Sequence, residues 1–361
     1  MIYREYGQTG KKISLLGFGG MRFKNVDDHD ECVRLMIAAA ESGINYFDTA
    51  PGYFETRSET VFGKAFAEMR KNKLPYYSAT KTFESTESGI RKEIEAQLKR
   101  LNIGTIDFYH IWCITTLGGW ENRKKDGILK TFAKLKEEKL INHICISSHL
   151  IKDEIKELLM EGVFEGVLFG YSAYNFKTRQ SAFDAIKEKK LGAVVMNPLG
   201  GGVIPQHPEL FKFITREGDS VVTAALRVLW DHPDITNTLV GFDTIEHLNE
   251  ALSAIEGYKP RSLSELEEVK SKAGESFEGI CTGCAYCAGC PVDIPIPYFM
   301  DAYNQKLLDK KTKDPIGNRL KWHWSLERSI AAKCTECGQC EKACTQHIDI
   351  INRLKEIASN S

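Results

Sequence analysis

The sequence contains no hydrophobic run long enough to cross a bilayer. Its apolar runs, such as residues 166–170, span only a few positions, whereas a membrane helix needs roughly 20. The first twelve residues lack the hydrophobic core of a secretory signal, so we expect a cytoplasmic protein. Neither sign of charge dominates, because 48 Lys and Arg residues face 49 Asp and Glu residues. This balance excludes the basic footprint of a dedicated nucleic-acid binder, and we expect neither nucleic acid nor membrane as a partner.

Two further absences narrow the fold class. No low-complexity segment is present and 42% of the residues are hydrophobic, which excludes a disordered chain. Neither of the glycine-rich stretches at 17–21 and 199–202 completes the G-x-G-x-x-G pattern before a helix. This argues against a Rossmann-type dinucleotide-binding half. The 361 residues fit a barrel of about 250 residues followed by a small module.

Cysteine is abundant and clustered. The chain has eleven cysteines, of which eight fall in two groups: Cys281, Cys284, Cys287 and Cys290, then Cys334, Cys337, Cys340 and Cys344. The second group has the C-x2-C-x2-C-x3-C spacing of bacterial ferredoxins. In a cytosolic chain, clustered thiols indicate metal ligands rather than disulfides. Structural zinc is the other alternative, but zinc sites favour two C-x-x-C pairs separated by a longer loop.

The spacing therefore predicts two 4Fe-4S clusters, one for each cysteine group. In two-cluster ferredoxins the fourth cysteine of each motif binds the other cluster. This pattern predicts that Cys344 joins the first three cysteines of the first group, and that Cys290 joins the first three of the second group.

Residues 1–256 alternate short β-branched or aromatic runs with amphipathic stretches. The expected strands are 15–20, 45–50, 75–80, 107–112, 143–148, 166–172, 192–197 and 237–241, and helical patterns include 28–42, 87–102 and 126–139. Eight such strand–helix units predict an α/β fold, a parallel (β/α)8 TIM barrel. Ser262 and Glu265 predict a helix-capping box after a linker that begins near residue 258.

We expect two domains, the barrel over 1–270 and a small α-rich, ferredoxin-like iron-sulfur domain over 271–361. The Lys- and Arg-rich stretch 309–324 lies between the two cysteine motifs. We expect it to be a solvated connection, with docking of an acidic partner as the alternative.

Polar residues follow two neighbouring barrel strands, where the catalytic groups of such barrels lie. Asp48 ends the second strand, Tyr53 lies in the loop after it, and Lys81 ends the third strand. An ammonium near a phenol favours the phenolate and lowers the phenol pKa, and a carboxylate keeps that ammonium charged. We therefore expect Tyr53 to exchange a proton with a carbonyl oxygen.

At these residues the sequence resembles the aldo-keto reductases. The resemblance rests on DTAPGY at 48–53, ATK at 79–81, the eight-strand rhythm and PLGGG at 198–202, and the cysteine tail is similar to a bacterial branch with a C-terminal 4Fe-4S domain. It implies a barrel that binds NAD(P)H without a Rossmann fold and transfers a hydride to a carbonyl. It also implies that Asp48, Tyr53 and Lys81 are three of four catalytic residues.

The fourth catalytic position departs from the family pattern. The resemblance implies a His five residues after Asp107, but this position is Trp112. His110 lies two residues earlier, roughly 6–7 Å down the strand, and reaches the site only if the strand carries a bulge. We expect Trp112 to narrow or cover the substrate pocket.

The resemblance also implies a nicotinamide cofactor site at the ends of several strands. By position, its residues are Met21, Ser147, Ser148, Tyr171, Pro198, Leu199, Gly200, Gly241, Asp243 and His247. Asp243 would repel a 2′-phosphate, whereas its carboxylate can accept a hydrogen bond from a ribose hydroxyl. This favours NADH over NADPH. No flavin motif is visible, although a bound flavin would connect hydride and single-electron chemistry.

The main interpretation is an oxidoreductase of an anaerobe that acts on a small carbonyl or alcohol. Its clusters would relay electrons, and a redox partner protein would exchange electrons with them. One alternative is an electron-transfer or redox-sensing protein whose barrel has lost reductase turnover, which Trp112 favours. Another is a lyase or isomerase that uses Tyr53 as acid or base without net redox change.

Overall fold

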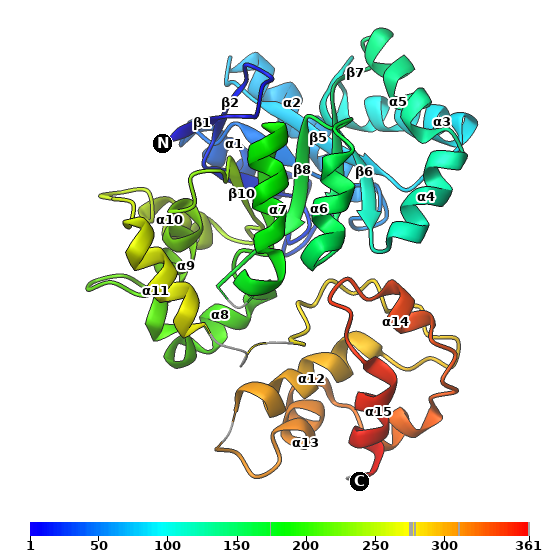
Figure 1. Cartoon of the computed structure of the whole chain (residues 1–361), viewed down its shortest axis with the longest axis vertical. Helices are drawn as coiled ribbons and strands as arrows, with labels where there is room; N and C mark the ends of the chain where they lie inside the picture. Colours follow the sequence, from blue (N-terminus) through cyan, green and yellow to red (C-terminus); the bar gives the residue numbers. More distant parts are fainter. Residues whose placement is uncertain (174, 274–276, 278, 310, 360–361) are drawn as a thin grey trace.

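The computed structural model describes residues 1–173, 175–273, 277, 279–309 and 311–359. The chain forms a closed barrel of eight parallel strands and a helical C-terminal region that lies at one end of the barrel (Figure 1). The barrel strands are β3 (Leu16–Gly19), β4 (Tyr46–Asp48), β5 (Tyr77–Thr82), β6 (Ile106–Ile114), β7 (Ile141–Ser148), β8 (Gly166–Gly170), β9 (Gly192–Met196) and β10 (Asn237–Val240). Strand β10 pairs with β3 and closes the barrel, which confirms the predicted fold.

Helices surround the barrel. They are α1 (His29–Glu41), α2 (Arg57–Lys71), α3 (Glu87–Leu101), α4 (Leu117–Lys125), α5 (Ile128–Glu137), α6 (Lys152–Met160), α7 (Phe176–Lys189), α8 (Val203–Gln206), α9 (Val221–Trp230), α10 (Ile245–Ser253) and α11 (Leu263–Lys272), with the short 3₁₀ helices η1 (Gly200–Gly202) and η2 (Pro208–Ile214) between β9 and α9. The three helical patterns of the sequence correspond to α1, α3 and α5. The capping box of Ser262 and Glu265 starts α11 as predicted. Within the described part of the chain, no helix is long and apolar enough to cross a membrane.

An N-terminal hairpin closes one end of the barrel. Its strands are β1 (Tyr3–Glu5) and β2 (Lys12–Ser14), and Tyr6 follows β1. The Tyr6 ring lies 4.3 Å from that of Phe108 and fills the space beside Gly166 and Gly192. A Cβ atom on either glycine would stand within 2.5 Å of the Tyr6 ring. Tyr6 therefore fills the barrel interior at this end, and the main pocket lies at the opposite end, where the strands terminate.

The C-terminal region has its own hydrophobic core. Its helices are α12 (Ile296–Leu308), α13 (Pro315–Arg319), the π-helical turn η3 (Leu320–Trp324), the 3₁₀ helix η4 (Arg328–Lys333), α14 (Gln339–Ala343) and α15 (Ile350–Ser359). The sequence predicts a solvated connection over the Lys- and Arg-rich stretch 309–324. In the described part of this stretch, Pro315–Arg319 and Leu320–Trp324 are helical, and Ile316 and Leu320 are buried in this core.

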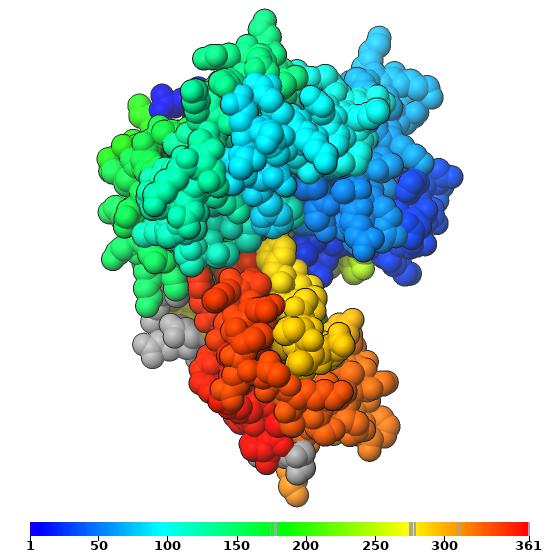
Figure 2. Space-filling view, turned by 90° about the vertical axis from the view of Figure 1, so that its right-hand side faces the viewer, coloured from blue at the N-terminus to red at the C-terminus, as the bar shows by residue number. Residues whose placement is uncertain are grey.

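The expected division after residue 270 falls inside α11. Leu266 and Val269 of this helix pack in the barrel's hydrophobic core, and Phe277 stacks on Phe211 with ring centroids 4.8 Å apart. The second core begins with the cysteines. The division remains a prediction, and the packing favours a boundary nearer residue 280. Figure 2 shows the C-terminal region, yellow to red, against the end of the barrel.

Candidate active site

A buried ion pair lies where β4 and β5 end. Lys81 Nζ is 2.5 Å from Asp48 Oδ1 and also donates to the Thr49 carbonyl at 2.7 Å. The two side chains are only 1% and 3% exposed. Burial raises the pKa of Asp48 and lowers that of Lys81, while their pairing opposes both shifts. The sequence thus brings these two residues together as expected.

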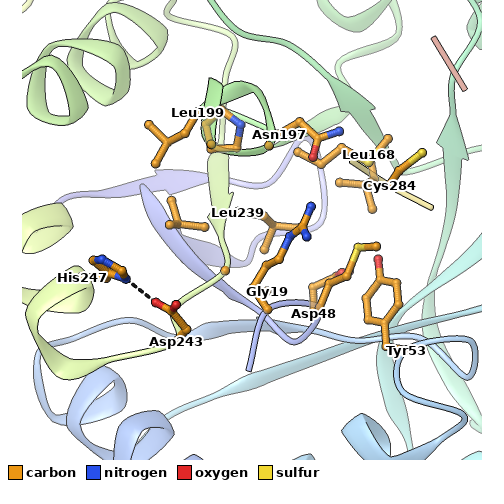
Figure 3. A pocket seen from close by; sticks show the side chains of 18 of the residues that line it. Gly19, Asp48, Tyr53, Leu168, Asn197, Leu199, Leu239, Asp243, His247 and Cys284 are labelled. Atoms are coloured by element: carbon orange, nitrogen blue, oxygen red, sulfur yellow. Dashed lines mark hydrogen bonds and ion pairs between the residues drawn. The ribbon is translucent and has the colours of Figure 1, made fainter. Parts of the chain in front are cut away.

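Tyr53 stands beside this pair. It lies in the turn between β4 and α2, where Phe54, Glu55 and Thr56 all adopt left-handed φ angles, between 51° and 73°. The Thr56 amide closes the turn on the Pro51 carbonyl at 2.8 Å. Lys81 Nζ lies 5.2 Å from the centre of the Tyr53 ring. The turn thus directs a half-buried phenol over the ammonium, and Figure 3 shows its oxygen pointing into a pocket.

The sequence predicts that Lys81 lowers the pKa of the Tyr53 phenol, and this prediction is wrong. Burial raises the pKa of Tyr53 well above its usual value, and the neighbouring Tyr286 and Asp48 raise it further. The ammonium of Lys81 is held by Asp48 and the Thr49 carbonyl, and it does not overcome this burial. Tyr53 is therefore a protonated phenol at neutral pH, which is the form that donates a proton.

Trp112 covers the site from the side of β6. Its ring stacks on Phe83 at 3.9 Å and meets the Tyr53 ring edge-on at 5.8 Å. The residue is 2% exposed. A β-bulge follows it, because the register with β7 shifts between Ile111 and Ile114 and Cys113 has a φ of 60°. The indole therefore fills the space beside the phenol.

The structure does not bring His110 to the pocket. It lies in register between Lys81 of β5 and Cys145 of β7, is fully buried, and its Nε2 lies 3.3 Å from the Tyr46 hydroxyl. The bulge comes after His110 along β6, so it does not move this residue toward Tyr53. Burial, together with the charge of Lys81, lowers the pKa of His110 to about 3 and keeps the imidazole neutral.

A pocket of about 1150 Å³, its open mouth included, lies at the accessible end of the barrel. Of the predicted residues, its lining includes Met21, Asp48, Tyr53, Pro198, Leu199, Gly241, Asp243 and His247. It thus extends from the phenol to the start of α10 (Figure 3). Asp243 and His247 are hydrogen-bonded to each other at this far end.

Other predicted cofactor residues lie outside this lining. Ser147 and Ser148 are buried at the end of β7, and the Ser148 hydroxyl accepts a hydrogen bond from the Leu150 amide at 3.2 Å. Tyr171 packs against Phe183 of α7, with ring centroids 4.9 Å apart, so it faces the surrounding helices. Gly200 is buried beside the pocket.

The glycine run after β9 accommodates the C-terminal region. Gly201 has a φ of 67°, and a Cβ atom there would stand 2.0 Å from the Thr282 carbonyl oxygen. This close approach is made by the segment that carries the first cysteine group.

The same segment forms part of the pocket wall. Cys284 and Tyr286 both line the pocket, and the Tyr286 ring meets Trp112 and His149 edge-on, at 6.3 Å in each case. Arg22 donates to the Gly283 carbonyl at 3.3 Å. The sequence pattern predicted Cys284 as a cluster ligand, but it predicted neither Tyr286 nor Arg22 at this pocket. An aromatic residue between two cluster cysteines was the one available signal for Tyr286.

The surroundings of the eight cysteines agree with the crossed grouping, which remains a prediction. Cys290, Cys334, Cys337 and Cys340 line one small cavity. In the other group, burial and the neighbouring Cys281, Cys284 and Cys344 raise the pKa of Cys287 to about 12. Among the described residues, no three His, Cys, Asp or Glu side chains form a single-ion site. Cluster thiolates stand further apart than the ligands of one ion, since each binds a different iron, so these residues fit two clusters.

Comparison with known proteins identifies both parts of the chain. Residues 15–271 match the aldo/keto reductase family, and residues 280–349 match a 4Fe-4S dicluster domain. L-galactose dehydrogenase of Arabidopsis thaliana is 26% identical over 301 residues, which cover 74% of this chain and 93% of that protein. The uncharacterized oxidoreductase YrpG of Bacillus subtilis is 25% identical over 305 residues, covering 71% and 91%.

The fold has a similar counterpart among solved structures. The holo form of the aldo-keto reductase AKR11C1 from Bacillus halodurans has a TM-score of 0.66 and 23% sequence identity, and covers 76% of this chain and 97% of that one. Because the family match spans most of the chain and the barrel has the corresponding fold, this protein belongs to the aldo/keto reductase family, with a 4Fe-4S dicluster domain at its C-terminal end.

Proposed function

We propose that this chain transfers a hydride between a nicotinamide cofactor and a small organic carbonyl or alcohol. The observation that carries the proposal is the protonated phenol of Tyr53, which faces the pocket beside the buried pair of Lys81 and Asp48. A phenol in this position can donate its proton to a carbonyl oxygen at the pocket floor.

Each residue of the pair has a separate role in this proposal. Lys81 places a positive charge near the phenol, which stabilises the phenolate left after proton donation. Asp48 holds that ammonium in place and compensates its charge in a buried site. Trp112 limits the room for the substrate beside the phenol and excludes water from it.

The pocket lining supports a nicotinamide cofactor. The lining includes the apolar Leu168 and Met196, and the end away from Tyr53 carries Asp243 and His247. A carboxylate at that end can accept hydrogen bonds from a ribose, which favours NADH. When bound, nicotinamide supplies or accepts the hydride, and this chain's residues position the carbonyl and move the proton.

We further propose that the two groups of four cysteines each bind one 4Fe-4S cluster. The four cysteines that line one small cavity, and the three that neighbour Cys287, support this proposal. Such clusters carry single electrons, so we propose exchange with a redox partner protein. The expected cytoplasmic location remains part of this proposal.

The test is Tyr53→Phe in anaerobically purified protein, assayed with NADH and a panel of aldehydes and ketones. We expect a loss of at least about 100-fold in carbonyl reduction, because proton donation contributes that much or more. Tyr3→Phe is the matched control, since Tyr3 is 45% exposed on the N-terminal hairpin. An undiminished rate in Tyr53→Phe refutes the assignment.

Trp112 supports a second candidate, a redox protein whose barrel no longer turns over carbonyls. Its indole occupies the space beside Tyr53 and contacts Tyr286. NADH binding, followed by fluorescence quenching, separates the two functions. No binding at millimolar NADH favours the second candidate. Binding with slow turnover that Trp112→His accelerates favours the reductase, and product formation without NADH consumption favours a lyase or isomerase.

A further inference from the structure

Two parts of the chain that are far apart in sequence face the same pocket. Tyr53 and Asp48 line it from the barrel, and Cys284 and Tyr286 line it from the C-terminal region. Figure 3 shows Cys284 and Tyr53 on the wall of this one pocket. A ligand bound there therefore contacts both a proton donor and a cysteine of the first group.

Several contacts hold the Cys284 segment against the barrel. Arg22 donates to the Gly283 carbonyl, the Thr282 carbonyl lies close to Gly201, and His347 Nε2 donates to the His149 carbonyl at 3.2 Å. Because the Thr282 and Gly283 contacts immediately precede Cys284, and the Tyr286 ring meets Trp112 just after it, the barrel fixes where this thiol stands. Figure 2 shows the same segment, in yellow, pressed against the barrel.

Cys284 is also a member of a proposed cluster site. Its sulfur lies 3.4 Å from the Thr345 hydroxyl, next to Cys344 in the chain, and its group contains Cys281 and Cys287. The ligand sulfurs are part of a cluster's electronic system, so hydrogen bonding and solvent around them change its reduction potential. A ligand beside Cys284 would therefore adjoin a thiolate that holds a cluster bound there.

We propose that the pocket also binds a flat conjugated dicarbonyl compound of the quinone class, which a reduced cluster held by Cys284 and its neighbouring cysteines would reduce one electron at a time. This activity rests on the iron-sulfur part of the proposed function and needs no nicotinamide.

The pocket lining selects this substrate class. Its lining includes the rings of Tyr286 and His149 and the apolar side chains of Leu168 and Met196, together with Tyr53 and Cys284. Flat rings pack favourably against such aromatic edges. A quinone also accepts electrons one at a time, which matches the single-electron chemistry of the clusters. A simple aldehyde has no conjugated ring over which to delocalise the first electron.

The step balances with two electrons and two protons. The two C=O groups of the quinone become two C–OH groups, as two electrons enter successively through Cys284. Tyr53 supplies one proton and is reprotonated by solvent, and the second proton comes from water at the pocket mouth. The electrons originate from a low-potential single-electron donor, which is dithionite in the experiment below.

The first test measures contact rather than turnover. Dithionite-reduced protein is freed of excess reductant and mixed with 1,4-dimethoxynaphthalene, a flat analogue that lacks the carbonyl groups. We expect the EPR signal of one cluster to change while the signal of the other stays constant. In Cys337→Ser, which disrupts the group remote from the pocket, the ligand-induced change persists.

The second test follows reoxidation of the clusters by menadione, using freeze-quench EPR. Met196→Trp places an indole in the pocket and is expected to slow this reoxidation at least tenfold and to abolish the ligand-induced change. Leu199→Trp is a second filling variant if the first does not fold. Leu263→Trp is the matched control, because Leu263 is 73% exposed on α11.

Iron content and circular dichroism identify which variants are folded and loaded. Equal reoxidation rates in the filled, control and unaltered proteins, with no EPR change, overturn the proposal. Because neither test uses NADH, their failure is distinct from a failure of Tyr53→Phe. Conversely, Tyr53→Phe keeps the EPR change even if it loses NADH-dependent carbonyl reduction.

Discussion

The buried pair of Asp48 and Lys81 gives a prediction that does not depend on the substrate. In Asp48→Asn, Lys81 keeps a neutral acceptor but loses its directly paired carboxylate in a site where the Lys81 side chain is 1% exposed, and the more distant Glu59 compensates its charge only weakly. Removing one partner of a buried ion pair costs about 3–5 kcal/mol. For a barrel of this size, 1 kcal/mol corresponds to roughly 2–4 °C in Tm. We therefore expect Tm to fall by roughly 6–20 °C.

The assay is thermal unfolding followed by circular dichroism at neutral pH. Asp27→Asn is the matched control, since Asp27 pairs with Arg57 at 2.9 Å but is 64% exposed. Exposed pairs contribute less than about 1 kcal/mol, so this variant should shift Tm by only a few degrees at most.

A double variant isolates the cause of the loss. Asp48→Asn combined with Lys81→Met leaves no unpaired charge in the site, so it should recover at least half of the stability lost in Asp48→Asn. Two outcomes would refute this role of the pair. One is that Asp48→Asn and Asp27→Asn unfold at the same temperature. The other is that adding Lys81→Met to Asp48→Asn lowers Tm again by the same amount.

Three further predictions address the buried histidine, the cysteine grouping and the nucleotide. The pKa of His110 is lowered from 6.5 to about 3, so below pH 6.5 the unfolded chain binds a proton that the native one does not. Stability should fall as the pH drops from 6.5 toward 3, by about 1.4 kcal/mol per pH unit for this group, and His110→Gln should remove that part of the slope in urea titrations. Cys290→Ser and Cys337→Ser should each lose about half of the iron and the same EPR signal; different signals would contradict the crossed grouping. Asp243→Ser should raise the preference for NADPH relative to NADH in kcat/KM, and an unchanged ratio means that Asp243 does not adjoin the ribose.

The parts of the fold that depend on local pattern were predictable from sequence. Each barrel strand is a short buried run, and each predicted run corresponds to one of β3 to β10. Asp48, Tyr53 and Lys81 could be predicted from sequence for the same reason. They lie at, or shortly after, the ends of strands that meet at one end of the barrel.

The side-chain orientations and the approach of the C-terminal region could not be predicted, because they depend on contacts between segments that are distant in sequence. Position after β8 places Tyr171 at the correct end of the barrel, but only packing against Phe183 decides that its ring faces outward. Tyr286 lies more than 200 residues beyond Tyr53 in sequence, yet its proximity contributes to the direction of the Tyr53 pKa. No periodicity or spacing encodes such an approach.

The contact between Gly201 and Thr282 also limits how these two modules can be combined. Any side chain at position 201 would collide with a main-chain atom and push the cysteine-bearing loop outward. A chimera that grafts this tail onto another reductase therefore needs glycine at the matching site. Without that glycine, the grafted tail could still bind iron, but its first cysteine group would be displaced from the barrel pocket.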